Sequence, residues 1–228
     1  MRKLFLIIML VASCMLYASG WHIGGEAGYA LNFLSTKTVW PNTYYRPGHG
    51  IEASFIAEYD INDSLSLSTG LRYIEKSFIY HHENSGITYA GYMEMDHFLE
   101  LPLSIRYSYS FGDLSVFIGA GGYIGIWFLA QSFGMNFSAS ETPDNTLIEN
   151  SNGDIMELTD SDNLFEAGLL AETGVSWTVA DDIRLDFTLR YEGNLTSLVR
   201  NYQENAVHRY NDTLSFSAGC LVPIGGKR

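Results

Sequence analysis

The feature that most constrains how this chain can fold is an alternation of apolar and polar residues over stretches of roughly ten. In LELPLSIRYSY, residues 99–109, every odd position is apolar or aromatic and the even positions are mostly polar or charged. Residues 183–192, IRLDFTLRYE, repeat the pattern. Because successive side chains of a β-strand point to opposite faces, each segment has one apolar wall and one polar wall. The sequence therefore predicts strands, and the function depends on which wall faces inward.

Eight such segments can be marked along the chain. They cover residues 22–34, 49–60, 64–79, 90–109, 114–130, 164–178, 183–194 and 210–222. The links alternate between short, turn-rich ones at 60–64, 110–113 and 180–182 and long ones at 35–48, 80–89, 131–163 and 195–209. This alternation is typical of an outer-membrane barrel with short periplasmic turns and long external loops. We therefore expect an all-β fold, an eight-stranded antiparallel up-and-down transmembrane β-barrel, in one domain over residues 21–228.

The first twenty residues have the features of an export signal. A basic pair, Arg2-Lys3, precedes an apolar run over residues 4–12, and Ala18-Ser19-Gly20 offers a cleavage site. The apolar run is too short to span a bilayer as a helix. We therefore predict a signal peptide over residues 1–20 and export through the general secretory pathway to the bacterial outer membrane. An alternative is a lipoprotein signal in which Cys14 is acylated.

Charge and cysteine content narrow the classes of function. The chain has 13 basic and 26 acidic residues, and loss of a signal containing Arg2 and Lys3 leaves 11 basic residues and a net charge of −15. So acidic a chain is not expected to bind nucleic acid, which requires a basic surface. The mature chain keeps one cysteine, Cys220, which cannot form an internal disulfide. We expect Cys220 to face lipid as a small apolar residue.

If the apolar side chains face lipid, the polar side chains of the same strands line the lumen of the barrel. An eight-stranded barrel is only wide enough for its own side chains, and a buried ion without a partner is costly. We therefore predict a closed lumen filled by a structural network of ion pairs. Its predicted members are Glu26, Glu52, Glu58, Arg72, Glu100, Arg106, Glu166, Glu172, Arg184, Asp186, Arg190 and Glu192. An alternative is that these charges form a path for protons or cations.

Aromatic residues near the segment ends predict contact with lipid, because amphipathic rings prefer the headgroup level of a membrane. The rings expected in two girdles are Trp21, Tyr59, Tyr73, Tyr107, Tyr109, Trp127, Trp177 and Tyr191. Several segments exceed the roughly 9–11 residues that cross a bilayer. We therefore expect strands that continue beyond the membrane as a protruding sheet.

Short motifs resemble those of the PorT-type outer-membrane β-barrel domain family of Bacteroidota. GLRYIEKSF at 70–78, followed by Tyr92 and LELPL at 99–103, is similar to the family's GLxYxxKxF and YLExPL strands. FEAG at 165–168 and LRYEGNL at 189–195 are similar to its DFG and RYxxGL strands. The resemblance implies an eight-stranded outer-membrane barrel of mostly unknown function, with a few relatives in secretion or gliding assemblies. The ending, IGGKR, departs from the aromatic last residue common in outer-membrane barrels.

Two groups of polar residues are candidates for chemistry. The link at 131–163 has seven acidic residues and no basic one, so Ca²⁺ could order it, although a solvated external loop is the simpler interpretation. Its acidic residues are Glu141, Asp144, Glu149, Asp154, Glu157, Asp160 and Asp162. His81, His82, Asp96 and His97 fall on the outer part of the second hairpin, where a hydrolase of this class would place catalytic groups. Nothing in the sequence fixes a nucleophile beside them.

We therefore predict a protein that is not an enzyme and needs no cofactor or metal. Its expected partners are outer-membrane lipid and a protein bound at the external loops, with an accessory role in a secretion or motility assembly as one such function. The alternative is a rim-active hydrolase that uses His97 or His81 with nearby carboxylates. A soluble ligand-binding barrel would require the same strands turned inside out.

Overall fold

A computed structural model describes residues 20–36, 43–84, 87–139, 146–179, 183–200 and 208–224. In this part of the chain, nine β-strands form one antiparallel sheet. They are β1 (Trp21–Thr36), β2 (Thr43–Asn62), β3 (Leu65–Asn84), β4 (Ile87–Phe111), β5 (Leu114–Ala139), β6 (Thr146–Met156), β7 (Phe165–Thr178), β8 (Arg184–Asn194) and β9 (Arg209–Ile224). The predicted signal up to residue 19, with Cys14, and the predicted turn at 180–182 lie outside the described residues. No helix of the described residues is long and apolar enough to cross a membrane.

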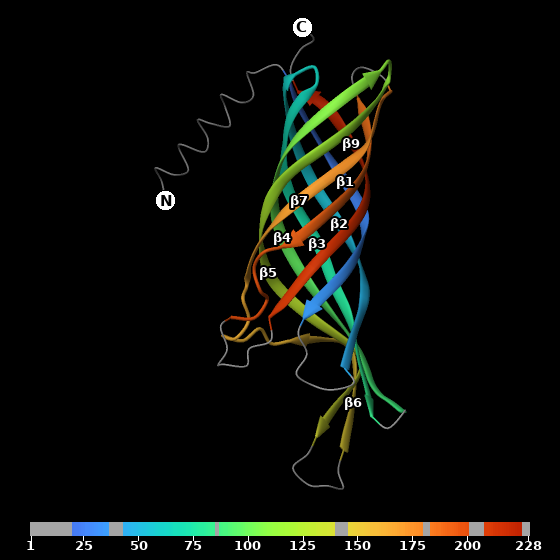
Figure 1. The fold of residues 1–228 in the computed structure, drawn as a ribbon, viewed down its shortest axis with the longest axis vertical. Helices are drawn as coiled ribbons and strands as arrows, with labels where there is room; N and C mark the ends of the chain where they lie inside the picture. Colours follow the sequence, from blue (N-terminus) through green and yellow to red (C-terminus); the bar gives the residue numbers. More distant parts are fainter. Residues whose placement is uncertain are drawn as a thin grey trace.

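Eight of these strands close into a barrel (Figure 1). The ring contains every strand except β6. Neighbours in the chain pair with each other, β5 pairs with β7 across the omitted β6, and β9 pairs with β1 to complete the ring. Following paired residues once around the ring from Trp21 leads back to Leu31 of the same strand, a register shift of ten residues. A shift of this size in eight strands tilts them by roughly 40° to the barrel axis. The predicted eight-stranded antiparallel barrel is confirmed.

The strand outside the ring corrects the prediction of a loop at 131–163. β5 continues past its contact with β7, and its residues 130–139 pair with β6 to form a hairpin that extends beyond the barrel (Figure 1). The apolar alternation continues here, because Phe133, Met135 and Phe137 are separated by single small or polar residues. Among the described strands β6 pairs on one side only, so it is an edge of the sheet.

The two ends of the barrel differ. β1 begins and β9 ends at the same end, because Trp21 pairs with Ile224, and we call this the turn end. Here the Asn62 side chain accepts hydrogen bonds at 2.9 Å from the backbone amides of Ser64 and Leu65, which fixes the tight β2–β3 turn.

We call the opposite end the loop end. The strands are longer there than the sequence predicts. β2 begins at Thr43, inside the predicted loop at 35–48, and β3 ends at Asn84, inside the predicted loop at 80–89. β2 and β3 have 20 residues each, β4 has 25 and β5 has 26. All four exceed the roughly 9–11 residues needed to cross a bilayer, so they continue well beyond it.

Apolar side chains face outward and charged side chains face inward. On β4, Ile105 is 55% exposed and its neighbour Arg106 is 2% exposed. This is the reverse of a soluble barrel, whose apolar wall would fill the interior. The prediction that Trp127 joins an outer aromatic girdle is wrong, because its side chain is only 5% exposed. Ile126 and Phe128, on either side of it, take the outer face.

An apolar cluster lies inside the barrel toward the loop end, and we call it the apolar plug. Its buried members are Ala30, Ile74, Phe98, Trp127, Ala130 and Leu198. Leu198 belongs to the connection between β8 and β9 and makes two backbone hydrogen bonds there. The Leu198 amide donates to the Arg209 carbonyl at 2.9 Å, and its carbonyl accepts from Asn163 at 2.8 Å. A connecting segment therefore folds over the barrel mouth and inserts a side chain into it.

Candidate functional site

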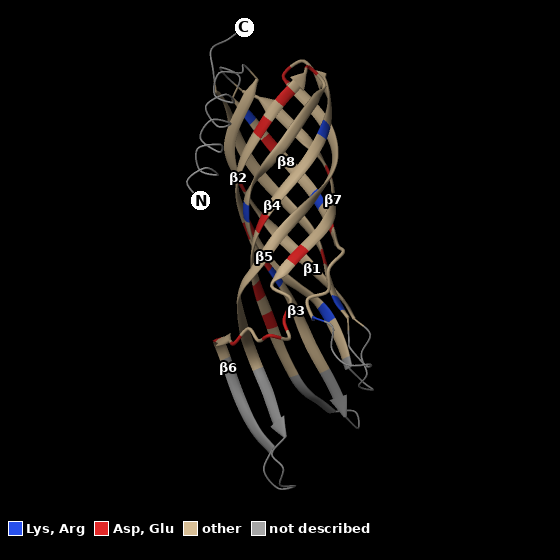
Figure 2. Cartoon of the chain, turned by 90° about the vertical axis from the view of Figure 1, so that its left-hand side faces the viewer, with Lys and Arg blue, Asp and Glu red and all other residues tan. Residues whose placement is uncertain are grey.

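Charged residues recur along the barrel strands, as the blue and red segments of the ribbon in Figure 2 show. Side chains from β1, β2, β3, β4, β7 and β8 form ion pairs with one another. The group nearest the turn end is built around Glu58, which accepts hydrogen bonds from Arg106 at 2.9 Å and from Arg184 at 2.8 Å. Arg184 also donates to Asp186 at 2.9 Å. Arg106 reaches the next group along the axis by donating to Glu172 at 2.8 Å. Each carboxylate in this group therefore faces a guanidinium.

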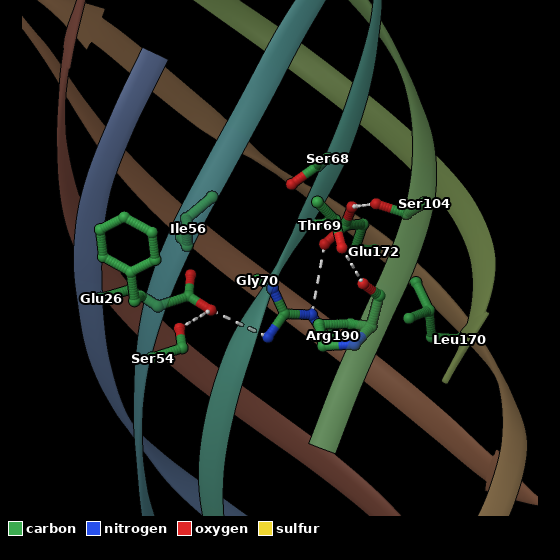
Figure 3. Close-up of a pocket in the computed structure, with 12 residues that line it drawn as sticks. Glu26, Ser54, Ile56, Ser68, Thr69, Gly70, Ser104, Leu170, Glu172 and Arg190 are labelled. Atoms are coloured by element: carbon green, nitrogen blue, oxygen red, sulfur yellow. Dashed lines mark hydrogen bonds and ion pairs between the residues drawn. The ribbon is translucent and has the colours of Figure 1, made fainter. Parts of the chain in front are cut away.

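The middle group is centred on Arg190 (Figure 3). Its guanidinium donates to Glu26 at 3.1 Å and to Glu172 at 3.2 Å. The hydroxyls of Ser54 and Ser104 donate to the same two carboxylates at 2.9 and 2.7 Å. The cavity among these side chains has a volume of about 10 Å³, which is room for about one water molecule. The lumen is filled at this level.

The third group surrounds Arg72, which is completely buried. Its guanidinium donates to Glu100 at 3.0 Å, pairs with Glu192, and lies 3.6 Å from Glu52. Three carboxylates from β2, β4 and β8 therefore converge on one side chain of β3. A single guanidinium that holds groups from opposite walls also fixes their spacing across the barrel.

Lys76 adds a cation that the sequence analysis missed. Its Nζ lies 2.9 Å from Glu100 Oε1 and pairs with Glu166, whose carboxylate also accepts a hydrogen bond from Tyr123 at 2.7 Å. The signal was present in the sequence, because Lys76 lies four residues beyond Arg72 and therefore on the same wall of the strand. The partner of Glu166 is this lysine rather than an arginine.

All twelve side chains predicted for the lumen are brought together, and each makes at least one ion pair. With Lys76 they form what we call the ion-paired lumen. Inward glycines of β5 leave space for it. A Cβ atom at Gly119 or Gly125 would lie 2.9 Å from the Cγ of Glu172 or Glu100, respectively.

A larger cavity of about 170 Å³ lies at the loop end, and we call it the mouth cavity. It is lined by Tyr92, Glu94, Trp127, Ala130, Met156, Glu157, Leu158, Asp162, Leu198, Val199 and Arg209. Two acidic residues of the predicted loop, Glu157 and Asp162, therefore line a cavity, whereas Glu141 and Asp144 lie outside the described residues. Sequence reasoning missed this cavity because the connections that cover it carry no regular pattern.

The histidines considered for a hydrolase lie apart from the mouth cavity lining. His97 Nδ1 is 2.7 Å from the Tyr73 hydroxyl, and its Nε2 is 3.0 Å from Gln131 Oε1. The Tyr73 hydroxyl also donates to Glu75 at 2.8 Å. These described contacts of His97 contain no serine, threonine or cysteine that could act as a nucleophile. His81 lies on β3, and the side chain of His82 is outside the described residues.

Asp96, the carboxylate considered beside those histidines, faces the interior and is completely buried. Among the described residues, no three His, Cys, Asp or Glu side chains lie close enough together to hold a metal ion. Cys220 is exposed on the outer face of β9.

A comparison with protein families agrees with this architecture. A model of the family described as outer membrane protein beta-barrel domain matches residues 12–200. The solved structure of neisserial surface protein A is 17% identical, with 90% of this chain and 97% of that chain covered and a TM-score of 0.46. OprG from Pseudomonas aeruginosa is 11% identical, with coverage of 91% and 97% and a TM-score of 0.46.

Ail of Yersinia pestis, solved in complex with the heparin analogue sucrose octasulfate, is 10% identical, with coverage of 89% and 99% and a TM-score of 0.40. A search of curated proteins gives no match. The family match covers most of the chain, and the closed ring with an apolar outer face is the structure that such a domain requires. The chain therefore belongs to the outer membrane protein beta-barrel domain family and is a β-barrel of the bacterial outer membrane.

Proposed function

We propose that this protein is an outer-membrane scaffold with a sealed lumen, and that it works by binding a partner at its loop end. The observation that supports this most strongly is the filled interior. Paired charges occupy the lumen from Glu58 to Lys76, and the apolar plug begins at the level of Lys76, whose Nζ lies 4.9 Å from the centre of the Phe98 ring. An eight-stranded barrel packed in this way leaves no passage for a solute. The useful surface is then the outside of the loop end.

The length of the strands supports a binding role for the loop end. On β4 the exposed apolar side chains run from Leu99 to Phe111, a span long enough for a bilayer crossing. Residues 87–98 of the same strand lie beyond that span. Because the turn end has the short connections, it faces the periplasm, and the loop end faces the outside of the cell.

The edge strand β6 supports a protein as the partner. An edge strand presents unpaired backbone groups to which an extended segment of another chain can add. Ile155 of β6 is 73% exposed, so an apolar side chain accompanies those groups. The resemblance to the PorT-type family favours a partner within a secretion or motility assembly.

Export through the general secretory pathway is part of the same proposal. Cleavage after Gly20 would free an N-terminus at Trp21, which is the first residue of β1. N-terminal sequencing of the protein from outer membranes is expected to begin at Trp21. A lipid-modified N-terminus at Cys14 would contradict this part of the proposal.

The partner role is tested by the native mass and composition of the protein after mild extraction from the outer membrane. We expect a complex larger than one barrel, with a defined companion. Ile155→Lys places a charge on the β6 edge and is expected to release that companion. The matched control is Ile61→Lys, which changes an exposed isoleucine at the turn end and should leave the complex intact. A wild-type protein that runs as a single barrel would contradict the proposal.

A further inference from the structure

The mouth cavity carries more negative than positive charge. Glu94, Glu157 and Asp162 line it, and Arg209 is the one basic side chain among its lining residues. In the described part of the chain, no ion pair within 4.0 Å joins any of these carboxylates to a base. This contrasts with the ion-paired lumen, where every carboxylate has a cationic partner. Glu94 is 5% exposed, so solvent hardly compensates its charge.

A fourth carboxylate, Asp96, lies next to residues that line the cavity without being one of them. Asp96 follows Glu94 on the same inner wall of β4, and its register partner on β5 is Ala130, which lines the cavity. The Asp96 side chain is 0% exposed, and both of its oxygens are buried without a hydrogen-bond partner in the described residues. Buried polar groups in folded proteins are nearly always satisfied. A buried carboxylate without a partner, beside an acidic cavity, therefore points to a cationic ligand.

The size and walls of the cavity indicate the kind of cation. The carboxylates are spread around the cavity, and no three of them in the described residues are close enough for a metal ion. Trp127 and Tyr92 supply aromatic walls, and Leu158 and Leu198 supply aliphatic ones. A volume of about 170 Å³ is slightly larger than the roughly 150 Å³ that accommodates benzene in an engineered protein cavity. The ligand would therefore have a charged group and a short apolar body.

We propose that the mouth cavity binds a small organic cation, a primary ammonium or guanidinium group on a short alkyl body. The charged group would lie between Glu94 and Asp96, and the alkyl body would lie against the indole of Trp127. An ammonium brings three donors, which suits oxygens that have no partner within the chain. This inference goes beyond the partner role proposed above, because it concerns the interior of the barrel mouth and not the edge of β6.

Proton linkage gives the proposal a specific signature. Burial raises the pKa of the Asp96 carboxyl well above its usual range, the Glu94 carboxylate raises this pKa further, and Arg209 opposes both effects. Glu166 and Asp162 also face Asp96 and raise the same pKa. A cation held against Asp96 favours its ionised form and so displaces a proton. Affinity for an organic cation is therefore expected to rise with pH, and binding should release protons.

The test is isothermal titration calorimetry on the full-length protein folded in a non-ionic detergent, with pentylammonium as the probe. 1-Pentanol is the neutral control of equal length, and empty micelles supply the background heat. We expect pentylammonium to bind at least tenfold more tightly than 1-pentanol, with proton release detected by repeating the titration in buffers of different ionisation enthalpy.

Two variants probe the carboxylates independently. Glu94→Gln and Asp96→Asn are each expected to weaken pentylammonium binding about tenfold, the loss of one charge-assisted contact. Both keep the side-chain shape, so the ring is expected to close. Asp96→Asn should also reduce proton release, and the remainder would come from Glu94, whose carboxyl pKa burial likewise raises. The matched control is Asp154→Asn, an exposed carboxylate of β6 outside the cavity, which should leave affinity unchanged.

Three results would overturn the proposal. Equal binding of pentylammonium and 1-pentanol, insensitive to Glu94→Gln, would mean that the cavity is merely apolar. Heat from Mg²⁺ that is lost in Glu94→Gln, with none from pentylammonium, would mean that it is a metal site. Absence of heat from any probe with the folded wild-type protein would mean that the cavity binds no small cation. None of these outcomes bears on the companion at β6, so the two proposals fail separately.

Discussion

The ion-paired lumen and the mouth cavity differ in whether their buried carboxylates have cationic partners. In the ion-paired lumen, four arginines and Lys76 are interleaved with eight carboxylates, and each carboxylate has a cationic partner. At the mouth cavity, Glu94 and the adjacent Asp96 are buried without an ion pair in the described residues. The difference separates charges that serve the fold from charges that point to a ligand.

The comparison has an energetic consequence. Removing one partner of a buried ion pair leaves an uncompensated charge and costs stability, whereas neutralising a carboxylate that already lacks a partner removes a cost. The same kind of substitution should therefore change stability in opposite directions in the two regions. The predictions below use this change of sign.

The largest effect is expected at Arg72. Arg72→Met leaves Glu52, Glu100 and Glu192 without their shared cation, and should lower the free energy of unfolding by about 3–5 kcal/mol. Urea titration of the folded barrel, followed by tryptophan fluorescence in detergent, measures the change. The control is Arg46→Met on the exposed face of β2, which should shift the midpoint little. Equal shifts in the two variants would mean that the ion pairs do not stabilise the lumen.

The apolar plug should give the next largest effect. Ile74 is completely buried between the walls of the barrel, so Ile74→Ala leaves a cavity and should cost about 2–4 kcal/mol. The matched control is Ile51→Ala on the outer face, where the side chain is already 56% exposed. A cost at Ile51 as large as that at Ile74 would argue that the plug is loosely packed.

Asp96→Asn should stabilise the protein, and the gain should depend on pH. Because burial raises the folded-state pKa of Asp96, the folded protein holds this proton more tightly than the unfolded chain, whose pKa is about 3.9. The stability that the protonated group contributes is complete below the unfolded pKa and is lost as pH rises through the folded pKa. Unfolding curves should show the variant about 1 kcal/mol more stable at pH 8. The two proteins should converge as the pH falls toward 4, and a destabilised variant at pH 8 would contradict the account.

The smallest effect is expected outside both regions. Asp154 is exposed on β6 and makes no ion pair in the described part of the chain, so Asp154→Asn should change stability by less than about 0.5 kcal/mol. This variant serves as the baseline against which the opposite signs at Arg72 and Asp96 are judged. A shift as large as at Arg72 would mean that net charge, rather than pairing, sets the stability.

Alternation alone was enough to predict the ring and the twelve inward charges, because side-chain direction in a strand follows from position. It was not enough near the loop end. β5 has an extra residue, Phe128, because Phe98 of β4 pairs with Trp127 and His97 pairs with Leu129. Beyond this bulge the inward side chains of β5 stand at even instead of odd positions. Such a bulge leaves no mark in an alternating sequence.

The mouth cavity was beyond prediction for a related reason. Leu198 and Asp162 come from connections without periodicity, and only tertiary contacts bring them over the barrel mouth. Asp96 was noticed as a carboxylate near histidines, but its complete burial was not predicted. Lys76, by contrast, was predictable from its position relative to Arg72 and was overlooked.

The central claim is that paired charges and the apolar plug seal the lumen, and conductance across a planar lipid bilayer tests it most directly. The purified full-length protein, inserted in one molar potassium chloride, is predicted to give no current steps above the bare membrane. Steady ohmic steps from the wild-type protein, one per inserted barrel, would mean that ions pass through the interior and would contradict the account.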